Sequence, residues 1–493
     1  MYRRTPGKVR IDTGWVQGTV QEGMSVYKGI PFAAPPVGDL RWKAPKPLQP
    51  WDTVLSATSF SKSPIQAFNM PGGSEDCLYL NVWSAAKTPG DKLPVMVWIY
   101  GGGFAMGSAS QFDGSKLASH GVVFVSINYR VGQIGFMAHP ELSAESPSHT
   151  SGNYGLLDQI AGLKWVKKNI AKFGGDPNNV TIFGESAGGI SVSMLCASPE
   201  AKGLFQRAIS RSGGSFGPTR KTSYPGENMK LLAQAEEEGK ALGESLGCSS
   251  ISEMRALPPE KLSRQMVVTG GAWPIVDGYV IPDDQYKMYE AGNFNDVDIL
   301  VGYNSDEGQS FSPTKNPEEH IAQVKERYGK FWEDLIRAYP VDMDTVPMSG
   351  RNLMRDAAFG WHTWVWANLE EKLGTGSVYL YCFDQHPADA FDTGSPHGQD
   401  VDYVFGSIAN PTIDTDLALS NIMMNYWTNF ARSGDPNGEG LPEWPRFDGK
   451  NVMYLTGDKP YVGGVPDLES LEVLDGYFAW RRTEEGAAWA NGK

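Results

Sequence analysis

One segment, residues 179–189, restricts the possible folds of this chain more than any other, and it reads Asn-Val-Thr-Ile-Phe-Gly-Glu-Ser-Ala-Gly-Gly. Its first half is a short apolar, β-branched run, which is the composition of a buried parallel strand. Its second half is Gly-x-Ser-x-Gly, followed by residues that suit a helix. The pattern predicts a strand, a sharp turn with Ser186 at its tip, and a helix.

The two glycines of this pattern have a local physical explanation. A residue that projects its side chain from a sharp strand-to-helix turn has strained backbone angles, so its neighbours must lack bulk where strand and helix approach. Gly184 and Gly188 provide that space. The N-terminus of the following helix would favour an anion near the Ser186 hydroxyl. The alternative is a chance match within a loop, which the flanking strand and helix argue against.

Composition and charge are those of a soluble globular protein with an acidic surface. The chain has 493 residues, of which 41% are hydrophobic and 20% charged, and this length permits a large core. The net charge of −14 argues against nucleic acid or an anionic membrane as a partner, because both require basic surfaces. No linker, repeat or low-complexity tract is evident, so we expect a single domain over residues 1–493.

The N-terminal residues and the cysteines bear on the compartment. The first residues are basic but lack a following apolar region, and no apolar run is long enough to span a bilayer, which predicts a cytoplasmic protein. The four cysteines show neither CxxC nor zinc-ligand spacing. We therefore expect reduced thiols and no metal site; two disulfides are the alternative. These cysteines are Cys77, Cys196, Cys248 and Cys382.

Alternating strands and helices predict an α/β fold. Continuous apolar runs are typical of parallel strands that are covered on both faces. They occur at residues 94–100, 122–129, 179–183, 204–210, 297–302 and 377–383. Residues 9–58 resemble an N-terminal β-meander. Helical periodicity occurs at residues 158–171 and 416–432. Two charged or aromatic segments, at about 223–264 and 318–372, also have helical character and are expected to be insertions. The sequence therefore predicts a large, mostly parallel central sheet with helical insertions.

Candidate partners for Ser186 follow later strands. A serine hydroxyl needs a base, usually a histidine that a carboxylate orients. In sheets with such a serine turn, the acid and then the histidine follow later in the chain. Asp306 and Glu307 follow the strand at 297–302, and His386 and His397 follow the strand at 377–383. Spacing favours His397, which glycines flank, and leaves His386 as the alternative.

A second glycine run suggests donors for an oxyanion. Gly101, Gly102 and Gly103 directly follow the strand at 94–100, and without side chains they can turn their N–H groups inward. The N–H group of Ala187 would complete the set. A phosphate-binding loop is the weaker alternative, because neither a Gly-Lys-Ser/Thr ending nor GxGxxG spacing is present.

Taken together, these motifs resemble the type B carboxylesterase family of α/β-hydrolases, which includes cholinesterases and bacterial para-nitrobenzyl esterases. The resemblance covers nearly the whole chain and implies an α/β-hydrolase fold with helical insertions over the active site. The motifs that carry it are residues 28–38, 74–82, 100–104, 173–177, 184–188, 304–308 and 397–406.

The resemblance implies roles for individual residues. Ser186 would be the nucleophile, Glu307 rather than Asp306 the acid, and His397 the base. The oxyanion hole would be formed by Gly102, Gly103 and Ala187.

The resemblance also implies supporting contacts. Two structural ion pairs would join Arg41 with Glu75 and Arg130 with Asp176. Glu185, beside the nucleophile, would be a buried support residue.

Departures from the family pattern are also informative. Secreted relatives pair the cysteine that matches Cys77 with one upstream, and no cysteine precedes Cys77 here. Cholinesterases have a tryptophan in the loop before this cysteine, which holds quaternary ammonium groups. Here that loop, residues 66–73, offers only Phe68. We therefore do not expect choline esters to be preferred substrates.

The expected function is hydrolysis of small to medium acyl or aryl esters through an acyl-enzyme, without metal or organic cofactor, by a monomer or weak homodimer. A feruloyl or aryl esterase is the alternative; a non-catalytic binding relative and a true lipase are less favoured. Aromatic residues of the insertions would either pack as core or line a substrate pocket. The pocket candidates are Phe68, Trp273, Trp361 and His362.

Overall fold

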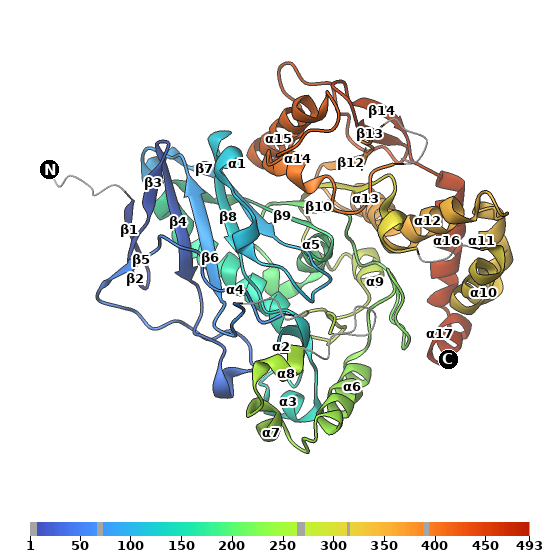
Figure 1. The fold of residues 1–493 in the computed structure, drawn as a ribbon, viewed down its shortest axis with the longest axis horizontal. Helices are drawn as coiled ribbons and strands as arrows, with labels where there is room; N and C mark the ends of the chain where they lie inside the picture. The colour runs from blue at the N-terminus through green and yellow to red at the C-terminus, as the bar shows by residue number, and fades with distance from the viewer. Residues whose placement is uncertain (1–6, 67–71, 264–271, 313–315, 388–393, 493) are drawn as a thin grey trace.

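An eleven-stranded sheet runs through the middle of the protein, in the strand order β14-β13-β12-β11-β10-β9-β7-β8-β6-β4-β3 (Figure 1). A separate three-stranded sheet has the order β1-β2-β5. The structure is a computed structural model that describes residues 7–66, 72–263, 272–312, 316–387 and 394–492.

The central strands pair in parallel, and both ends of the sheet are antiparallel. The parallel strands are β7 (Leu93–Ile99), β8 (Val123–Ile127), β9 (Gly175–Glu185), β10 (Arg207–Arg211), β11 (Asp298–Asn304), β12 (Val378–Phe383) and β13 (Asn451–Leu455). The antiparallel strands are β3 (Thr19–Gln21), β4 (Met24–Pro31), β6 (Tyr79–Ser84) and β14 (Tyr461–Gly464). The small sheet contains β1 (Lys8–Ile11), β2 (Gly14–Gln17) and β5 (Val54–Ser56).

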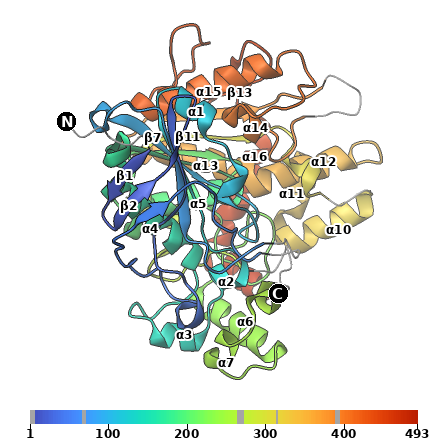
Figure 2. The same cartoon turned by 60° about the vertical axis from the view of Figure 1, so that its left-hand side comes forward.

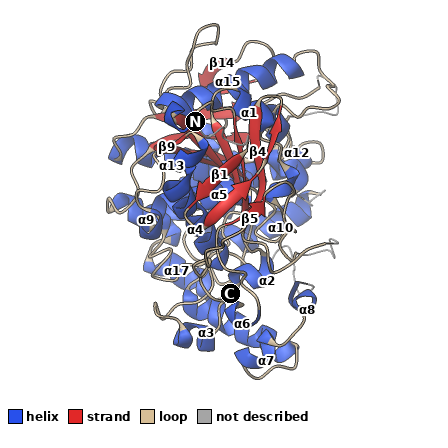
Figure 3. Cartoon of the chain, turned by 90° about the vertical axis from the view of Figure 1, so that its left-hand side faces the viewer, coloured by secondary structure: helices blue, strands red, loops and turns tan. Residues whose placement is uncertain are grey.

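Helices lie on either side of the strands, as Figure 3 shows. Those up to β11 are α1 (Ser115–Ser119), α2 (Gly132–Phe136), α3 (Pro140–Glu145), α4 (Tyr154–Asn169), α5 (Ala187–Ala197), α6 (Leu232–Ser245), α7 (Ile251–Arg255), α8 (Pro259–Ser263) and α9 (Gln285–Glu290). The later ones are α10 (Pro317–Tyr328), α11 (Trp332–Ala338), α12 (Val346–Arg355), α13 (Trp361–Leu373), α14 (Val401–Phe405), α15 (Asp416–Ser433), α16 (Leu468–Arg481) and α17 (Glu484–Asn491).

The predicted fold class is confirmed. A mostly parallel sheet with an antiparallel N-terminal part lies between helices, which is the arrangement expected of an α/β-hydrolase fold. Helices occupy both segments expected to be insertions. The α6–α8 group extends from one end of the sheet, whereas α10–α12 gather beside α16 (Figures 1 and 2).

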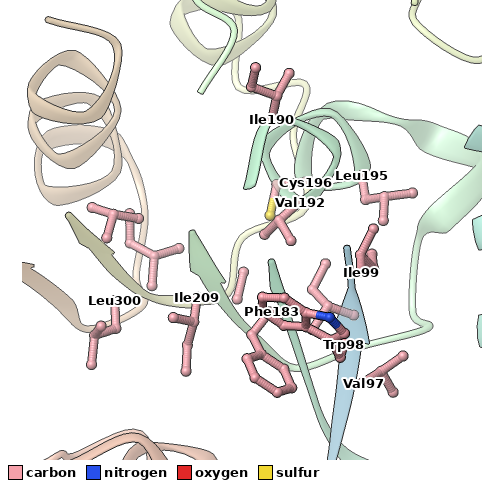
Figure 4. Close-up of a cluster of buried hydrophobic side chains, with 14 of the residues drawn as sticks. Val97, Trp98, Ile99, Phe183, Ile190, Val192, Leu195, Cys196, Ile209 and Leu300 are labelled. Carbon is pink, nitrogen blue, oxygen red and sulfur yellow. The ribbon is translucent and has the colours of Figure 1, made fainter. Parts of the chain in front are cut away.

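The core on which the serine turn rests includes apolar side chains from β7, β9 and α5, together with Ile209 of β10 and Leu300 of β11 (Figure 4). Trp98 and Phe183 lie on adjacent strands, their ring centroids 4.9 Å apart. Val192 and Leu195 of α5 are also buried. Each such side chain contributes about 1.5–3 kcal/mol by leaving water, so strand and helix are firmly packed just where the turn between them must be positioned.

One predicted ion pair is confirmed, and the other is wrong. Arg41 Nε donates to Glu75 Oε1 at 2.7 Å. Arg130, however, pairs with Asp158 of α4, with Nε and Nη2 each 2.8 Å from a carboxylate oxygen. Arg130 follows the carboxyl end of β8, whereas Asp176 lies at the amino end of β9. Because β8 and β9 both run parallel to β7, these positions lie at opposite edges of the sheet.

The described part of the chain contains no helix that is both long and apolar enough to cross a membrane. All four cysteines are buried free thiols. The expectation of reduced cysteines therefore agrees with the structure, and the alternative of two disulfides does not. Burial raises the pKa of the Cys77 thiol well above its ordinary value, so this group is a poor nucleophile.

Replacement of Asp158 by alanine should destabilise the protein by about 3–5 kcal/mol, because it leaves the Arg130 guanidinium buried without its partner. Asp176→Ala is the matched control. Asp176 is only partly buried and accepts a hydrogen bond from the Asn178 N–H group, so its loss should cost about 1 kcal/mol or less. Urea unfolding of both variants measures this difference. Equal decreases in the free energy of unfolding would mean that the Arg130–Asp158 pair stabilises the protein no more than the Asp176 hydrogen bond does.

Candidate active site

Ser186 occupies a strained turn between β9 and α5. Its backbone angles are φ 56° and ψ −127°, a region that residues with side chains rarely adopt. A Cβ atom on Gly184 would lie 2.4 Å from the backbone of Gly188, and one on Gly188 would lie 2.0 Å from the carbonyl oxygen of Ile99. The two glycines thus permit the close approach of strand and helix that the sequence predicted.

Ser186, His397 and Glu307 form one chain of hydrogen bonds. The distance from His397 Nε2 to Ser186 Oγ is 2.8 Å, and that from His397 Nδ1 to Glu307 Oε2 is 2.5 Å. Ser186 follows β9, Glu307 follows β11 and His397 follows β12. The carboxyl ends of these three strands share one edge of the sheet. This geometry is that of a serine nucleophile with a base and an orienting acid.

The alternative partners lie in other contacts. The Asp306 carboxylate forms an ion pair with Arg351. The His386 ring is within 3.4 Å of Asp384 and contacts its neighbour's carbonyl oxygen. The structure thus brings Glu307 and His397, and neither of these alternatives, to Ser186.

Glu307 is fully buried and held by two donors. Its Oε1 atom accepts hydrogen bonds from the Asn304 N–H group, at 2.8 Å, and from the Ser212 hydroxyl. These bonds leave Oε2 directed at the histidine. The sequence analysis missed Ser212. Its one signal was its place directly after β10, which is the neighbour of both β9 and β11.

Arg211 connects the serine turn to the histidine loop. Its carbonyl oxygen accepts the Ser186 N–H group at 2.9 Å. Its buried guanidinium binds the Asp400 carboxylate, with Nη2 and Oδ2 2.8 Å apart. Asp400 lies three positions after His397, so one arginine fixes both the backbone of Ser186 and the loop that carries the histidine.

The His397 ring lies in an aromatic and acidic setting. It stacks on Phe359, with centroids 4.8 Å apart, and meets the edge of Phe311 at 5.0 Å. Burial disfavours the charged ring, but the Glu307 and Glu185 carboxylates outweigh this and raise the pKa of His397 to about 9. Glu185 Oε1 is 3.4 Å from Nε2, and burial raises the pKa of Glu185 to about 7. The site therefore stabilises an imidazolium ion.

Three backbone N–H groups are available beside Ser186. Those of Gly102, Gly103 and Ala187 make no hydrogen bond with another described residue. Ala187 is the first residue of α5, where helix amides lack an intrahelical acceptor. A Cβ atom on Gly101 would lie 2.9 Å from Ser186 Cβ, so the glycine loop lies in close contact with the serine turn. This arrangement can hold an oxyanion.

A cavity of about 310 Å³ opens on Ser186, and we call it the Ser186 cavity. Its lining is largely apolar and aromatic, and it includes Trp273, as predicted. The lining residues are Gly103, Ser186, Ala187, Ile190, Gly214, Ser215, Ser223, Tyr224, Pro225, Gly226, Asn228, Met229, Trp273, Phe311, Ala358 and Phe359.

Trp361 and His362 do not line this cavity, contrary to the prediction. Trp361 stacks on Phe478 at 3.9 Å, and the buried His362 Nδ1 atom accepts the Phe216 N–H group at 3.0 Å. A turn of π-helix at Asp356–Gly360 precedes them. Phe359, within this turn, lines the cavity, whereas Trp361 and His362 are fully buried in the core. Phe68 lies outside the described residues.

Buried arginines anchor one wall of the cavity. The Glu227 carboxylate accepts hydrogen bonds from Arg220, at 3.3 Å, from Arg327, at 3.2 Å, and from Arg481. Arg327 also donates to the Pro225 carbonyl oxygen at 2.6 Å. Burial alone would raise the pKa of Glu227, but these guanidinium groups lower it. The wall formed by residues 223–229 is therefore firmly attached to α10 and α16.

No group of three or more His, Cys, Asp or Glu side chains suited to a metal ion occurs within the described ranges.

The sequence of the chain matches the Carboxylesterase family over residues 5–465. The chain belongs to this family. It is a carboxylic ester hydrolase, as similar proteins also indicate.

Relatives match this carboxylesterase over most of its length. Fumonisin B1 esterase of Sphingopyxis macrogoltabida is 36% identical over 91% of this chain and 86% of that protein. Para-nitrobenzyl esterase of Bacillus subtilis is 36% identical over 94% of this chain and 97% of that protein. A solved PNB esterase structure superposes with a TM-score of 0.83 at 33% identity, covering 95% of this chain and 100% of that one.

Replacing Glu185 by glutamine should move the acidic limb of the kcat/KM profile to lower pH by about one unit, because loss of a nearby negative charge lowers the pKa of His397. The neutral ring is the form that accepts a proton, so the variant should retain activity at a pH where the parent has lost it. Initial rates of p-nitrophenyl acetate hydrolysis across the pH range measure the shift.

The control for this experiment is Glu371→Gln, which removes an exposed carboxylate on α13. Its profile should coincide with that of the parent. A profile of Glu185→Gln that also coincides would contradict the electrostatic link between Glu185 and His397.

Proposed function

We propose that the protein hydrolyses small to medium acyl or aryl esters through an acyl-enzyme, with Ser186 as nucleophile, His397 as base and Glu307 as the orienting acid. The observation that carries the proposal is the continuous hydrogen-bond chain Ser186–His397–Glu307 at the edge of an aromatic cavity. Membership of the carboxylesterase family supports the same reaction class.

In the first half-reaction, Ser186 Oγ attacks the ester carbonyl carbon and transfers its proton to His397 Nε2. The Nδ1–H group of His397 donates to Glu307, which stabilises the imidazolium ion. The N–H groups of Gly102, Gly103 and Ala187 receive the oxyanion. The tetrahedral intermediate then collapses, and the alcohol leaves with the proton from His397.

In the second half-reaction, water attacks the acyl carbon of the Ser186 ester and gives a proton to His397. A second tetrahedral intermediate forms in the same set of N–H donors. Its collapse releases the carboxylic acid and returns the proton to Ser186 Oγ. Apart from the ester and water, each step uses side chains and backbone groups of this chain.

The substrate range follows from the cavity. Its volume of about 310 Å³ lies at the lower end of the range for small-molecule sites, which favours small to medium esters. The rings of Tyr224, Trp273, Phe311 and Phe359 surround the space and can stack on an aryl group. This aromatic lining favours a second candidate, an aryl esterase for feruloyl or benzyl esters.

Rapid mixing with p-nitrophenyl acetate should give a burst of nitrophenol equal to the enzyme concentration if deacylation is the slower step. Ser186→Ala should abolish the burst and lower kcat by about 10⁴-fold or more, because the nucleophile is lost. A stopped-flow trace at the nitrophenolate wavelength, with mass spectrometry of the quenched protein, measures both effects.

The matched controls are His397→Gln and His386→Gln. The first should resemble Ser186→Ala, and the second should retain nearly full activity, because His386 contacts Asp384 instead of Ser186. Full activity of Ser186→Ala would refute the assignment. A parent protein with no esterase activity above this variant would support a binding relative instead.

A panel of p-nitrophenyl esters from acetyl to longer acyl chains, with methyl ferulate and a benzyl ester, should separate the two substrate classes. We expect kcat/KM to fall at the longest unsubstituted acyl chains, because the Ser186 cavity is small. A ferulate preference that Phe359→Leu removes would support the aryl esterase. Highest activity on emulsified long-chain esters, with interfacial activation, would contradict both proposals.

A further inference from the structure

A second cavity lies next to the Ser186 cavity, between α2, α6 and the wall loop. Its volume is about 320 Å³, and we call it the α6 cavity. Its lining includes Gln133, Ser223, Asn228, Lys230, Glu238 and Trp273. None of these residues belongs to the hydrogen-bond chain of Ser186.

The two cavities share a wall. Ser223, Asn228 and Trp273 line both of them. The Trp273 ring packs against the edge of Phe104, with centroids 4.7 Å apart, and Phe104 packs on Phe136 at 5.2 Å. A partly buried tryptophan on a rigid aromatic support thus stands between the space at Ser186 and the space at α6.

The α6 cavity differs from the Ser186 cavity in its chemistry. The side-chain amide of Gln133, the Ser223 hydroxyl and the amide NH₂ of Asn228 make no hydrogen bond with another described residue. Such groups are available to a ligand, and partly buried polar groups without a partner favour one that can hydrogen-bond.

The charges in the α6 cavity are balanced. The Lys230 ammonium forms an ion pair with the Glu238 carboxylate, and they are the only charged lining residues among those described. A site with one cation and one anion already paired does not favour a charged ligand. Uncharged hydroxyl, ether or amide groups suit this lining best.

We infer that the α6 cavity is a subsite for the far end of a longer ester, and that it takes an uncharged, hydrogen-bonding tail that passes Trp273. This inference rests on the proposed function, because it assumes that the ester carbonyl lies at Ser186. It assigns a substrate class: esters with an apolar middle and a hydroxylated or amide-bearing end.

The test compares how fast the intact protein hydrolyses esters whose tails have matched lengths but different end groups. The probes are p-nitrophenyl esters of octanoic, nonanoic, ω-hydroxyoctanoic and ω-carboxyoctanoic acids, and acetate esters of octanol, nonanol and octanediol, so that both sides of the ester are sampled. In one of the two series, a terminal hydroxyl should raise kcat/KM about fivefold over a methyl group of equal size, the worth of about one hydrogen bond.

Two variants locate the effect. Ala241→Trp adds bulk at an α6 position that lines the cavity, and Gln133→Leu replaces a hydrogen-bonding side chain by an apolar one of similar size. Each should bring the hydroxyl-to-methyl ratio close to one. The matched control is Ala233→Trp, which adds the same bulk at an exposed α6 position outside the cavity lining and should keep the parent's ratio.

Hydrolysis of p-nitrophenyl acetate tests the proposed function separately from the α6 subsite, because the acetyl group is too short to pass Trp273. Acetate activity that depends on Ser186, without a hydroxyl preference in either series, would overturn the subsite and leave the proposed function standing. A stronger preference for the carboxylate tail would overturn the assignment of an uncharged class. A hydroxyl preference that survives both variants would place the tail elsewhere and likewise overturn the inference.

Discussion

The site depends on the close approach of β9 and α5 at one strained residue. Ser186 has a positive φ, a conformation that persists only where the surrounding structure imposes it. Two features impose it: the absence of side chains at Gly184 and Gly188, and the buried packing of strand and helix around Trp98 and Phe183. If this packing loosened, the hydroxyl would lose its position relative to both the His397 ring and the N–H groups of Gly102, Gly103 and Ala187.

A second constraint is the number of charges buried around the serine turn. Glu307 and the pair of Arg211 and Asp400 are fully buried, and Glu185 is nearly so. Such burial is costly unless each charge has partners. Each has a structural use here: Glu307 holds the histidine ring, Arg211 joins the turn to the histidine loop, and Glu185 favours the charged form of His397.

Sequence reasoning located the strands from β7 to β12 along the chain, the serine turn and the candidate partners, because these features follow from local patterns. It failed where the answer depends on which ends of separate elements meet. Arg130 pairs with Asp158 rather than Asp176 because parallel strands place their two ends at opposite edges. Trp361 was misplaced for a similar reason: its ring stacks on Phe478 of α16, a contact between segments distant in sequence that periodicity does not reveal.

The sequence by itself determined the fold class, the serine turn and a short set of candidate partners, since glycine placement, apolar periodicity and motif order are properties of the chain. The choice of Glu307 and His397 from that set came from the resemblance to the carboxylesterase family. Only the tertiary structure decided the shape and lining of the two cavities. Their walls come from segments distant in sequence, such as Phe311 and Trp273. Side-chain packing between distant segments fixes such a space, and no local pattern encodes it.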